Sequence, residues 1–207
     1  MDLDQEMKVE VDLIDKNFNR NVIFKQLSAV FSKGCISAIL GPNGSGKSTL
    51  IKVLSGQLSP DKGHLQFNGI KYEEQKIYEH IGYVAPYIDI PEEYRFEELL
   101  DFHRLFKKST WTNQAILSET GLQRFTKLPI KEYSSGMKQR VKLSLNLFFD
   151  HGIYLFDEPC SHLDQNGYEW FLHHLANLKN KGVVILGSND KQEYRLAEQY
   201  VDIQDFK

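Results

Sequence analysis

Hydrophobic and polar positions alternate loosely from residue 7 to residue 31, and polar groups interrupt the alternation at residues 16–17 and 19–21. A period of two is typical of half-buried strands, and polar interruptions are typical of turns. We therefore expect antiparallel strands joined by turns in this region. Residues 35–40 form a short apolar run of the kind found in buried strands, and residues 48–57 carry apolar side chains at helical spacing.

The rest of the chain alternates between strand and helix signals. Strands are expected at residues 64–67, 81–84, 153–156 and 183–186, helical spacing runs from residue 91 to about 142, and another helix is expected at 167–180. Strands that alternate with helices indicate a mostly parallel sheet with helices on its faces. We predict an α/β fold in a single domain over residues 1–207, with an antiparallel β-subdomain and an inserted α-helical lobe at about residues 87–142.

Composition narrows the class of protein. The chain has 207 residues, enough for one good core but short for two domains, and its net charge of −3 offers no basic field for nucleic acid. No apolar run approaches the roughly 20 residues of a membrane-crossing helix. Residues 1–6 are acidic, whereas a secretory signal starts basic. We expect a cytoplasmic protein with no nucleic-acid partner, which reaches the membrane only through another protein, and two reduced cysteines, Cys35 and Cys160.

The strongest local signal is a glycine-rich segment between the buried strand at 35–40 and the helix at 48–57. It matches the phosphate-binding pattern G-x-x-x-x-G-K-[ST] and consists of Gly41, Pro42, Asn43, Gly44, Ser45, Gly46, Lys47 and Ser48, followed by Thr49. Glycines let backbone N–H groups approach phosphate, and the helix that follows points its positive end there. We expect Lys47 to meet the β and γ phosphates and the Ser48 hydroxyl to ligate Mg²⁺. An ordinary glycine-rich turn is the alternative interpretation.

A pair of carboxylates follows the apolar strand at 153–156. A Mg²⁺–nucleotide site needs an acidic side chain at the end of a strand opposite its phosphate loop, and Asp157 has that position. Glu158, one residue later, is a candidate for polarising the attacking water. Surface carboxylates are common, so this pair indicates a nucleotide site only in combination with the phosphate loop. Together they predict a P-loop NTPase core.

Further segments resemble the nucleotide-binding domain of ABC transporters over essentially the whole chain. Residues 133–141, which contain Ser134 and Gly136, are similar to the family's signature segment, and residues 161–164, which end at Asp164, are similar to its D-loop. Phe18 stands where the family usually stacks an aromatic ring on adenine. The resemblance implies ATP and Mg²⁺ as cofactors, with the signature serine and glycine meeting the γ-phosphate from a second copy. The alternative is that residues 134–136 only cap a helix.

Two positions depart from the family pattern. Ala85, Pro86 and Tyr87 stand where the family has its Q-loop glutamine, and neither Pro86 nor Tyr87 supplies a carboxamide, although Asp89 is a conceivable substitute. Asn189 replaces the switch histidine. An asparagine amide donates a hydrogen bond but does not become cationic. We therefore expect hydrolysis that persists, through Glu158 and Lys47, but is slower than in relatives with the histidine.

The leading hypothesis is an ATPase subunit that dimerises around ATP and drives a transmembrane permease subunit. Its groove near residues 83–95 is expected to receive a helix of that partner on an apolar surface formed by Pro86, Tyr87, Ile88, Ile90 and Tyr94, although internal packing explains these residues equally well. Chain length and the Ser135-Gly136-Met137 form favour an exporter weakly. The alternatives are an ABC-type ATPase that moves no solute and a regulatory subunit impaired in hydrolysis. None of the seven histidines is assigned a catalytic role.

Overall fold

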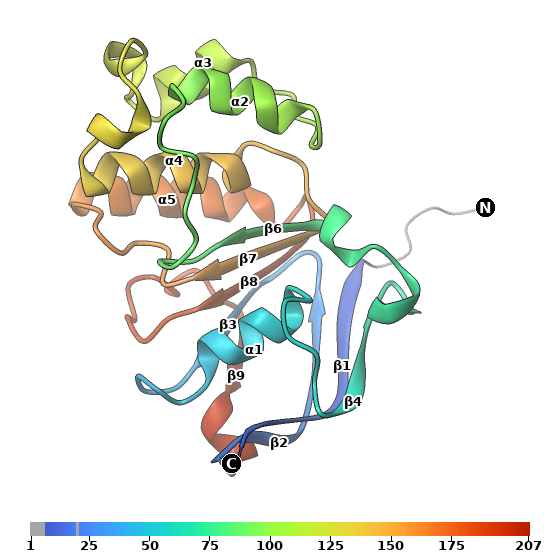
Figure 1. The fold of residues 1–207 in the computed structure, drawn as a ribbon. Helices are drawn as coiled ribbons and strands as arrows, with labels where there is room; N and C mark the ends of the chain where they lie inside the picture. Colours follow the sequence, from blue (N-terminus) through green and yellow to red (C-terminus); the bar gives the residue numbers. More distant parts are fainter. Residues whose placement is uncertain (1–6, 20) are drawn as a thin grey trace.

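The computed structural model describes residues 7–19 and 21–207, so the acidic start at residues 1–6 lies outside it. The described chain forms two sheets and a set of helices (Figure 1). The strands are β1 (Lys8–Phe18), β2 (Asn21–Ser32), β3 (Ile36–Leu40), β4 (Lys62–Phe67), β5 (Ile70–Lys71), β6 (Ile81–Val84), β7 (Ile153–Asp157), β8 (Val183–Gly187) and β9 (Gln199–Asp202). The helices are α1 (Lys47–Leu54), α2 (Phe96–Arg104), α3 (Asn113–Glu119), α4 (Ser135–Leu147) and α5 (Gln165–Leu178).

The first sheet is antiparallel and has the strand order β2-β1-β4-β5. Its first two strands account for the alternating pattern at the start of the sequence. Val9 and Ile14 on β1 and Phe24 and Leu27 on β2 are fully buried, and polar residues stand between them. The expected antiparallel β-subdomain is therefore present.

The second sheet has the order β6-β7-β8-β3-β9, and all its neighbouring strands are parallel. Successive side chains of a strand point to opposite faces, so each central strand serves two cores. On β7, Tyr154 and Phe156 pack in the core below the helices α4 and α5, whereas Ile153 and Leu155 pack in the core shared with α1 and the antiparallel sheet. Because both faces are covered, β7 and β8 are apolar and buried throughout.

The helical lobe extends from α2 to the start of α4 and lies on one side of the parallel sheet (Figure 1). Its helices pack through Phe96, Leu100, Ile116 and Val141, which are all fully buried. The last helix, α4, continues to Leu147, beyond the expected limit near residue 142, and packs against α5 and β6. The lobe is thus continuous with the core that covers the sheet.

Two strands have no counterpart in the expectations from sequence. β5 is only two residues long, and β9 pairs in parallel with β3 at the edge of the sheet although Gln199, Tyr200 and Asp202 give it a polar sequence. An edge strand exposes much of its surface to solvent and so lacks the apolar run that marks a central strand. Of the helices in residues 7–19 and 21–207, none combines the length and the apolar character needed to cross a bilayer.

Candidate functional site

The glycine-rich segment forms the turn between β3 and α1. Gly46 is the residue before the helix and has a φ of +112°, in the left-handed region that favours glycine. A Cβ at this position would stand 2.5 Å from Cγ2 of Ile23 on β2. The backbone conformation and the packing of β2 therefore both require glycine where the helix begins.

The interior of this turn fits a polyanion. The Lys47 side chain is almost fully buried, and its ammonium donates to the carbonyls of Gly41 (2.8 Å) and Pro42 (3.1 Å). The Ser45 hydroxyl is buried and has no hydrogen-bond partner within the described residues. A buried ammonium and an unpartnered hydroxyl beside the first turn of a helix suit the phosphates of a nucleotide.

Two oxygen groups meet where a magnesium ion is expected. The Ser48 hydroxyl donates to Oδ1 of Asp157 at 3.1 Å, which brings the start of α1 to the end of β7. Burial raises the pKa of Asp157, and the hydrogen bond from Ser48 acts in the opposite direction. A hydroxyl and a single carboxylate fit Mg²⁺, because this ion usually keeps waters and nucleotide oxygens as its other ligands. The structure thus brings together the two residues predicted for the metal.

Tyr87 enters this site, which the sequence did not indicate. Its hydroxyl lies 3.4 Å from Oδ2 of Asp157 and hydrogen-bonds to the hydroxyl of Tyr83. Tyr87 therefore occupies the surroundings of Asp157 at the position where the family places its glutamine. The alternative helper Asp89 is an exposed residue, and the described contacts do not connect it to Asp157.

The predicted base and the switch residue follow neighbouring parallel strands. Glu158 has a φ of +45°, and its backbone N–H donates to the carbonyl of Gly187 at 2.9 Å, so the strand ends in a strained residue held by β8. The amide of Asn189 donates to Oδ1 of Asn43 in the phosphate loop at 2.8 Å. Asn189 thus faces the loop, as the resemblance implies, and its role toward a nucleotide stays a prediction.

Two other residues hold these loops and were missed from sequence. Glu193 is buried, and its Oε1 accepts from the backbone N–H of Cys160, just after the Glu158 turn. The Lys207 ammonium donates to the backbone carbonyls of Ser45 and Ile23. Both contacts join segments far apart in sequence, so no local pattern signals them.

The signature segment and the D-loop form a separate polar hollow. It is lined by Ser134, Gly136 and Met137 from the start of α4 and by His162 and Asp164 from the loop before α5, and the phosphate loop does not contribute to it. A Cβ on Gly136 would lie 3.0 Å from the carbonyl oxygen of His162, so glycine permits the close approach of the two segments.

The polar side chains of this hollow have local partners. The Ser134 hydroxyl accepts from the Met137 N–H at 3.3 Å and so caps α4, and Asp164 accepts from the Gly167 N–H at 2.8 Å and caps α5. Capping is thus a real function of both residues. Their contact with nucleotide on a second copy stays a prediction.

Phe18 stands at the end of β1 with its side chain 45% exposed, and the Lys16 ammonium lies 5.6 Å from the ring centre. The neighbouring strand β2 reaches the phosphate loop through Ile23. An exposed ring on this hairpin is available for stacking, but adenine binding by Phe18 stays a prediction.

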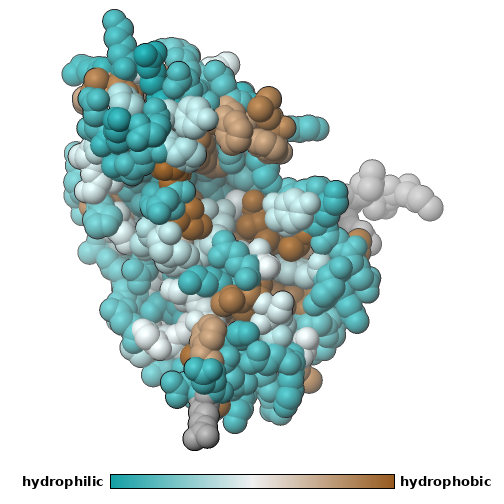
Figure 2. Space-filling view, in the orientation of Figure 1, coloured by the Kyte–Doolittle hydropathy of each residue, from teal (hydrophilic) through white to brown (hydrophobic). Residues whose placement is uncertain are grey.

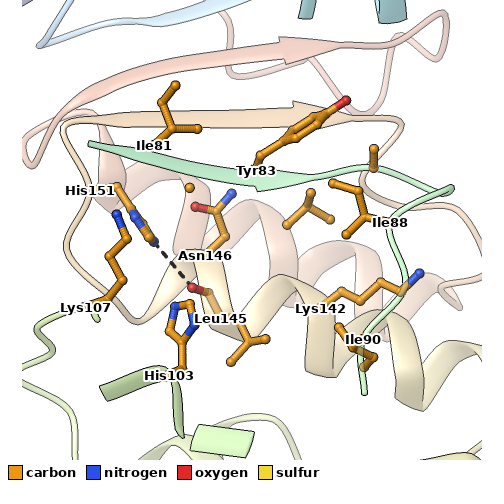
Figure 3. Close-up of a pocket in the computed structure, with 13 residues that line it drawn as sticks. Ile81, Tyr83, Ile88, Ile90, His103, Lys107, Lys142, Leu145, Asn146 and His151 are labelled. Carbon is orange, nitrogen blue, oxygen red and sulfur yellow. Dashed lines mark hydrogen bonds between the residues drawn. The ribbon is translucent and has the colours of Figure 1, made fainter. Parts of the chain in front are cut away.

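A groove lies between the sheet edge and the helical lobe, where Figure 2 shows a hollow bordered by hydrophobic residues. Figure 3 shows Ile88 and Ile90 beside it, with His103, Lys107 and His151 at one end and Lys142 at the other. Ile81 and Tyr83 also line it from β6, although their side chains lie on the other face of the strand. Ile88 and Ile90 line the groove as expected from sequence. Pro86, Tyr87 and Tyr94 do not, and Tyr87 points to Asp157 instead.

The chain is similar in sequence to known proteins. The family model described as "ABC transporter" matches residues 24–161. The lantibiotic transport ATP-binding protein SrtF of Streptococcus pyogenes is 26% identical over 185 residues, which cover 87% of this chain and 79% of that protein. The manganese transport system ATP-binding protein MntB of Bacillus subtilis is 29% identical over 206 residues, which cover 94% of this chain and 80% of that protein.

The fold is also found among solved structures. A dimeric structure of the ATP-binding cassette MJ0796, in a post-hydrolysis state with ADP and Pi, superposes with a TM-score of 0.81 at 22% identity and covers 94% of this chain and 93% of that chain. The predicted fold class, a P-loop NTPase core with a parallel sheet, is therefore confirmed. The family model covers most of the chain, including the phosphate loop and the end of β7. The chain thus belongs to the ABC transporter family, as an ATP-binding subunit with the ATPase fold and activity of that family.

Proposed function

We propose that two copies of this chain close around two ATP molecules and that this movement drives a transmembrane permease subunit. The observation that carries the proposal is the division of the site. The phosphate loop and Asp157 lie together, whereas Ser134 and Gly136 line a different hollow of the same chain. The binding site around a nucleotide on the loop is complete only if a second copy brings its own Ser134 hollow to that nucleotide.

Within each site, different residues would bind the phosphates, hold the metal ion and activate the attacking water. Lys47 and the loop N–H groups bind the phosphates, and Ser48 and Asp157 would hold Mg²⁺, which neutralises charge on the phosphates when it is bound. Glu158 follows Asp157 directly and polarises the attacking water. Asn189 is tethered to the phosphate loop through Asn43 and donates a hydrogen bond there. Since its amide does not take up a proton, we expect slow turnover.

The groove of Figure 3 is the proposed seat of the permease. It combines apolar walls with lysines at its two ends, Lys107 and Lys142, which favours an apolar helix with acidic ends. Next to it, Phe102, Leu105 and Phe106 at the end of α2 are all more than half exposed. Clustered exposed apolar residues are typical of interaction surfaces. This protein would then act on the cytoplasmic side of a membrane, bound to its partner.

The relatives' names mention lantibiotic transport and manganese transport, so they do not agree on one cargo. We propose export as the direction, on the form of the signature segment alone, with residues 1–207 acting as one domain. Uptake of a labelled solute into inside-out vesicles that contain the complex would support export, and uptake into right-side-out vesicles would contradict it.

The central test uses the Glu158→Gln variant. We expect it to bind ATP with Mg²⁺ in a calorimeter, to lose steady-state phosphate release by about 100-fold or more, and to form a dimer with ATP in size-exclusion chromatography. In the same phosphate-release assay, the Asn189→His variant is expected to turn over ATP severalfold faster than the wild type, because an imidazole adds a titratable donor.

The outcomes of this test separate the candidate functions. A wild-type chain without affinity for ATP and Mg²⁺, or a Glu158→Gln variant that stays monomeric with ATP, contradicts the proposal. Phosphate release by the wild type that is unchanged in Glu158→Gln would mean that Glu158 is not the base. Binding and dimerisation without turnover would identify an ATP-dependent switch.

The groove is tested by Ile88→Asp, with Ile70→Asp as the matched control. Ile88 lines the groove, whereas Ile70 is a half-exposed residue of β5 in the other sheet. We expect Ile88→Asp to lose co-purification with the permease while its ATP binding in the calorimeter is unchanged, because a carboxylate in an apolar contact must be desolvated. Ile70→Asp should retain both. Equal retention by the two variants would exclude the groove as the seat.

A further inference from the structure

Tyr83 and Tyr87 form a pair of phenols between the nucleotide site and the groove, and none of the nucleotide-binding or catalytic roles above uses them. We propose that Tyr87, supported by Tyr83, is a positioning residue that orients the Asp157 carboxylate for the Mg²⁺ of bound ATP and links it to the wall of the groove. The inference rests on the proposed function and adds residues that the catalytic motifs do not contain.

The contacts of Asp157 are shared between two hydroxyl groups. Ser48 donates to Oδ1 at 3.1 Å, and the Tyr87 hydroxyl lies 3.4 Å from Oδ2. Asp157 is 1% exposed, so almost no solvent is available to satisfy the second oxygen. With one hydroxyl on each oxygen, the plane of the carboxylate is fixed, and Ser48 and Asp157 remain on one side for a cation.

The two phenols remain donors at neutral pH. Burial raises the pKa of Tyr87 to about 12 and raises the pKa of Tyr83 above its ordinary value. The nearby Asp157 carboxylate acts in the same direction, because a second negative charge is unfavourable beside it. Neutral phenols each have one O–H to donate, so Tyr83 and Tyr87 form a short chain of hydrogen bonds that ends on Asp157.

The Tyr87 ring is held from a third direction. The Lys52 ammonium of α1 lies 4.2 Å from the centre of this ring, a cation–π contact. The helix that starts at the phosphate loop therefore contacts the ring, while the hydroxyl reaches β7. Tyr87 thus joins α1 and β7, the two elements that carry Ser48 and Asp157.

The same two tyrosines lie beside the groove. Tyr83 is one of its lining residues, and Figure 3 shows its side chain on the face of β6 away from Leu145 and Asn146, where it packs against the core that contains α1. Ile88, the residue after Tyr87, lines the groove, and its N–H donates to the carbonyl of Ala85 at 3.2 Å, which closes a tight turn at the end of β6. The residue that reaches Asp157 is therefore joined directly, through the backbone, to a residue of the groove wall.

The test compares Tyr87→Phe with Tyr78→Phe, a control on an exposed tyrosine. At saturating ATP, we expect Tyr87→Phe to need about threefold to tenfold more Mg²⁺ for half-maximal phosphate release, the scale of one ordinary protein hydrogen bond. ATP binding measured with EDTA should stay at the wild-type value. Tyr78→Phe should match the wild type in both measurements.

A second readout does not depend on turnover. In protein labelled with 3-fluorotyrosine, the ¹⁹F resonance that disappears in Tyr87→Phe should shift on addition of ATP with Mg²⁺ but not of ATP with EDTA. Tyr87→Gln places a carboxamide N–H near the carboxylate and should lower the Mg²⁺ concentration for half-maximal phosphate release at least part of the way back to the wild-type value. If Tyr87→Gln needs less Mg²⁺ than Tyr87→Phe, the effect is due to the hydrogen-bond donor and not to packing of the ring.

The two proposals fail in different ways. If the wild type binds and hydrolyses ATP but Tyr87→Phe keeps the wild-type Mg²⁺ dependence, or the ¹⁹F resonance does not respond to Mg²⁺, the role of Tyr87 is overturned and the proposed function stands. If the wild type does not bind ATP with Mg²⁺, the proposed function itself is overturned.

Discussion

Asp157 and His151 are both buried polar residues, and burial shifts their pKa values in opposite directions. It raises the pKa of the Asp157 carboxyl and lowers the pKa of the His151 imidazole to about 3. In both cases the neutral form is favoured, because a low-dielectric interior penalises charge. At Asp157, Ser48 and Lys47 oppose the shift, as suits a group that would face a cation. At His151 the nearby Lys107 reinforces it.

The shift at His151 predicts a loss of stability in acid. The unfolded chain takes up a proton near pH 6.5, whereas the folded chain does not until about pH 3, so this contribution is complete above pH 6.5 and declines as the pH falls. Between pH 7.5 and 5.5 we expect the free energy of unfolding to fall by about 1 kcal/mol through this group. Urea denaturation at the two pH values measures it.

The control for this prediction is His151→Gln, compared with the wild type at each pH. Burial also lowers the pKa of His103 and His174, whereas it raises the pKa of Glu193, so the total slope contains terms of both signs. Only the difference between the two proteins isolates His151. An equal loss of stability in His151→Gln and wild type would contradict the assignment.

At the scale of elements, the beginnings of helices decide which side chains are held in place. Thr112 accepts from the N–H of Ala115 at the start of α3, and Ser134 accepts from the N–H of Met137 at the start of α4. These are similar caps in one lobe, but only Ser134 lies in the hollow that we propose for the partner's nucleotide. The pair therefore offers a matched comparison.

We expect Ser134→Ala and Thr112→Ala to lower the free energy of unfolding by a similar amount, about 1 kcal/mol each, through loss of a helix cap. Ser134→Ala should in addition weaken the ATP-dependent dimer of the Glu158→Gln background, because its hydroxyl would meet the γ-phosphate. Chemical denaturation and size-exclusion chromatography measure the two effects. Equal dimerisation in both variants would leave Ser134 with capping alone.

The lengths of elements also follow from local chemistry. β7 and β8 are apolar throughout because both faces of the parallel sheet are covered, and the sequence identified them with little error. α5 begins at Gln165, two residues earlier than the apolar spacing indicates, because Asp164 caps it. β9 was missed, since its pairing with β3 is made by backbone groups at a sheet edge and requires no apolar pattern.

At the scale of the whole molecule, the parallel sheet explains why the site is where it is. The strands β7 and β8 end on the same side as the loop before α1, as their arrows show in Figure 1. Asp157 is the last residue of β7, and Glu158 and Asn189 follow the ends of β7 and β8. Residues more than 100 positions apart thereby meet, as Ser48 and Asp157 do. The lobe lies to one side and leaves the groove between itself and β6.

The sequence alone determined the fold class, the phosphate loop and the two carboxylates at the end of β7, because each depends on a short segment whose residue types are dictated by backbone geometry or by a buried strand. Only the tertiary structure decided that Tyr87 reaches Asp157 and that Glu193 holds the turn after Glu158. These contacts join segments separated along the chain. Their existence depends on the register of parallel strands and on the packing of loops, and neither leaves a periodic signal in the sequence.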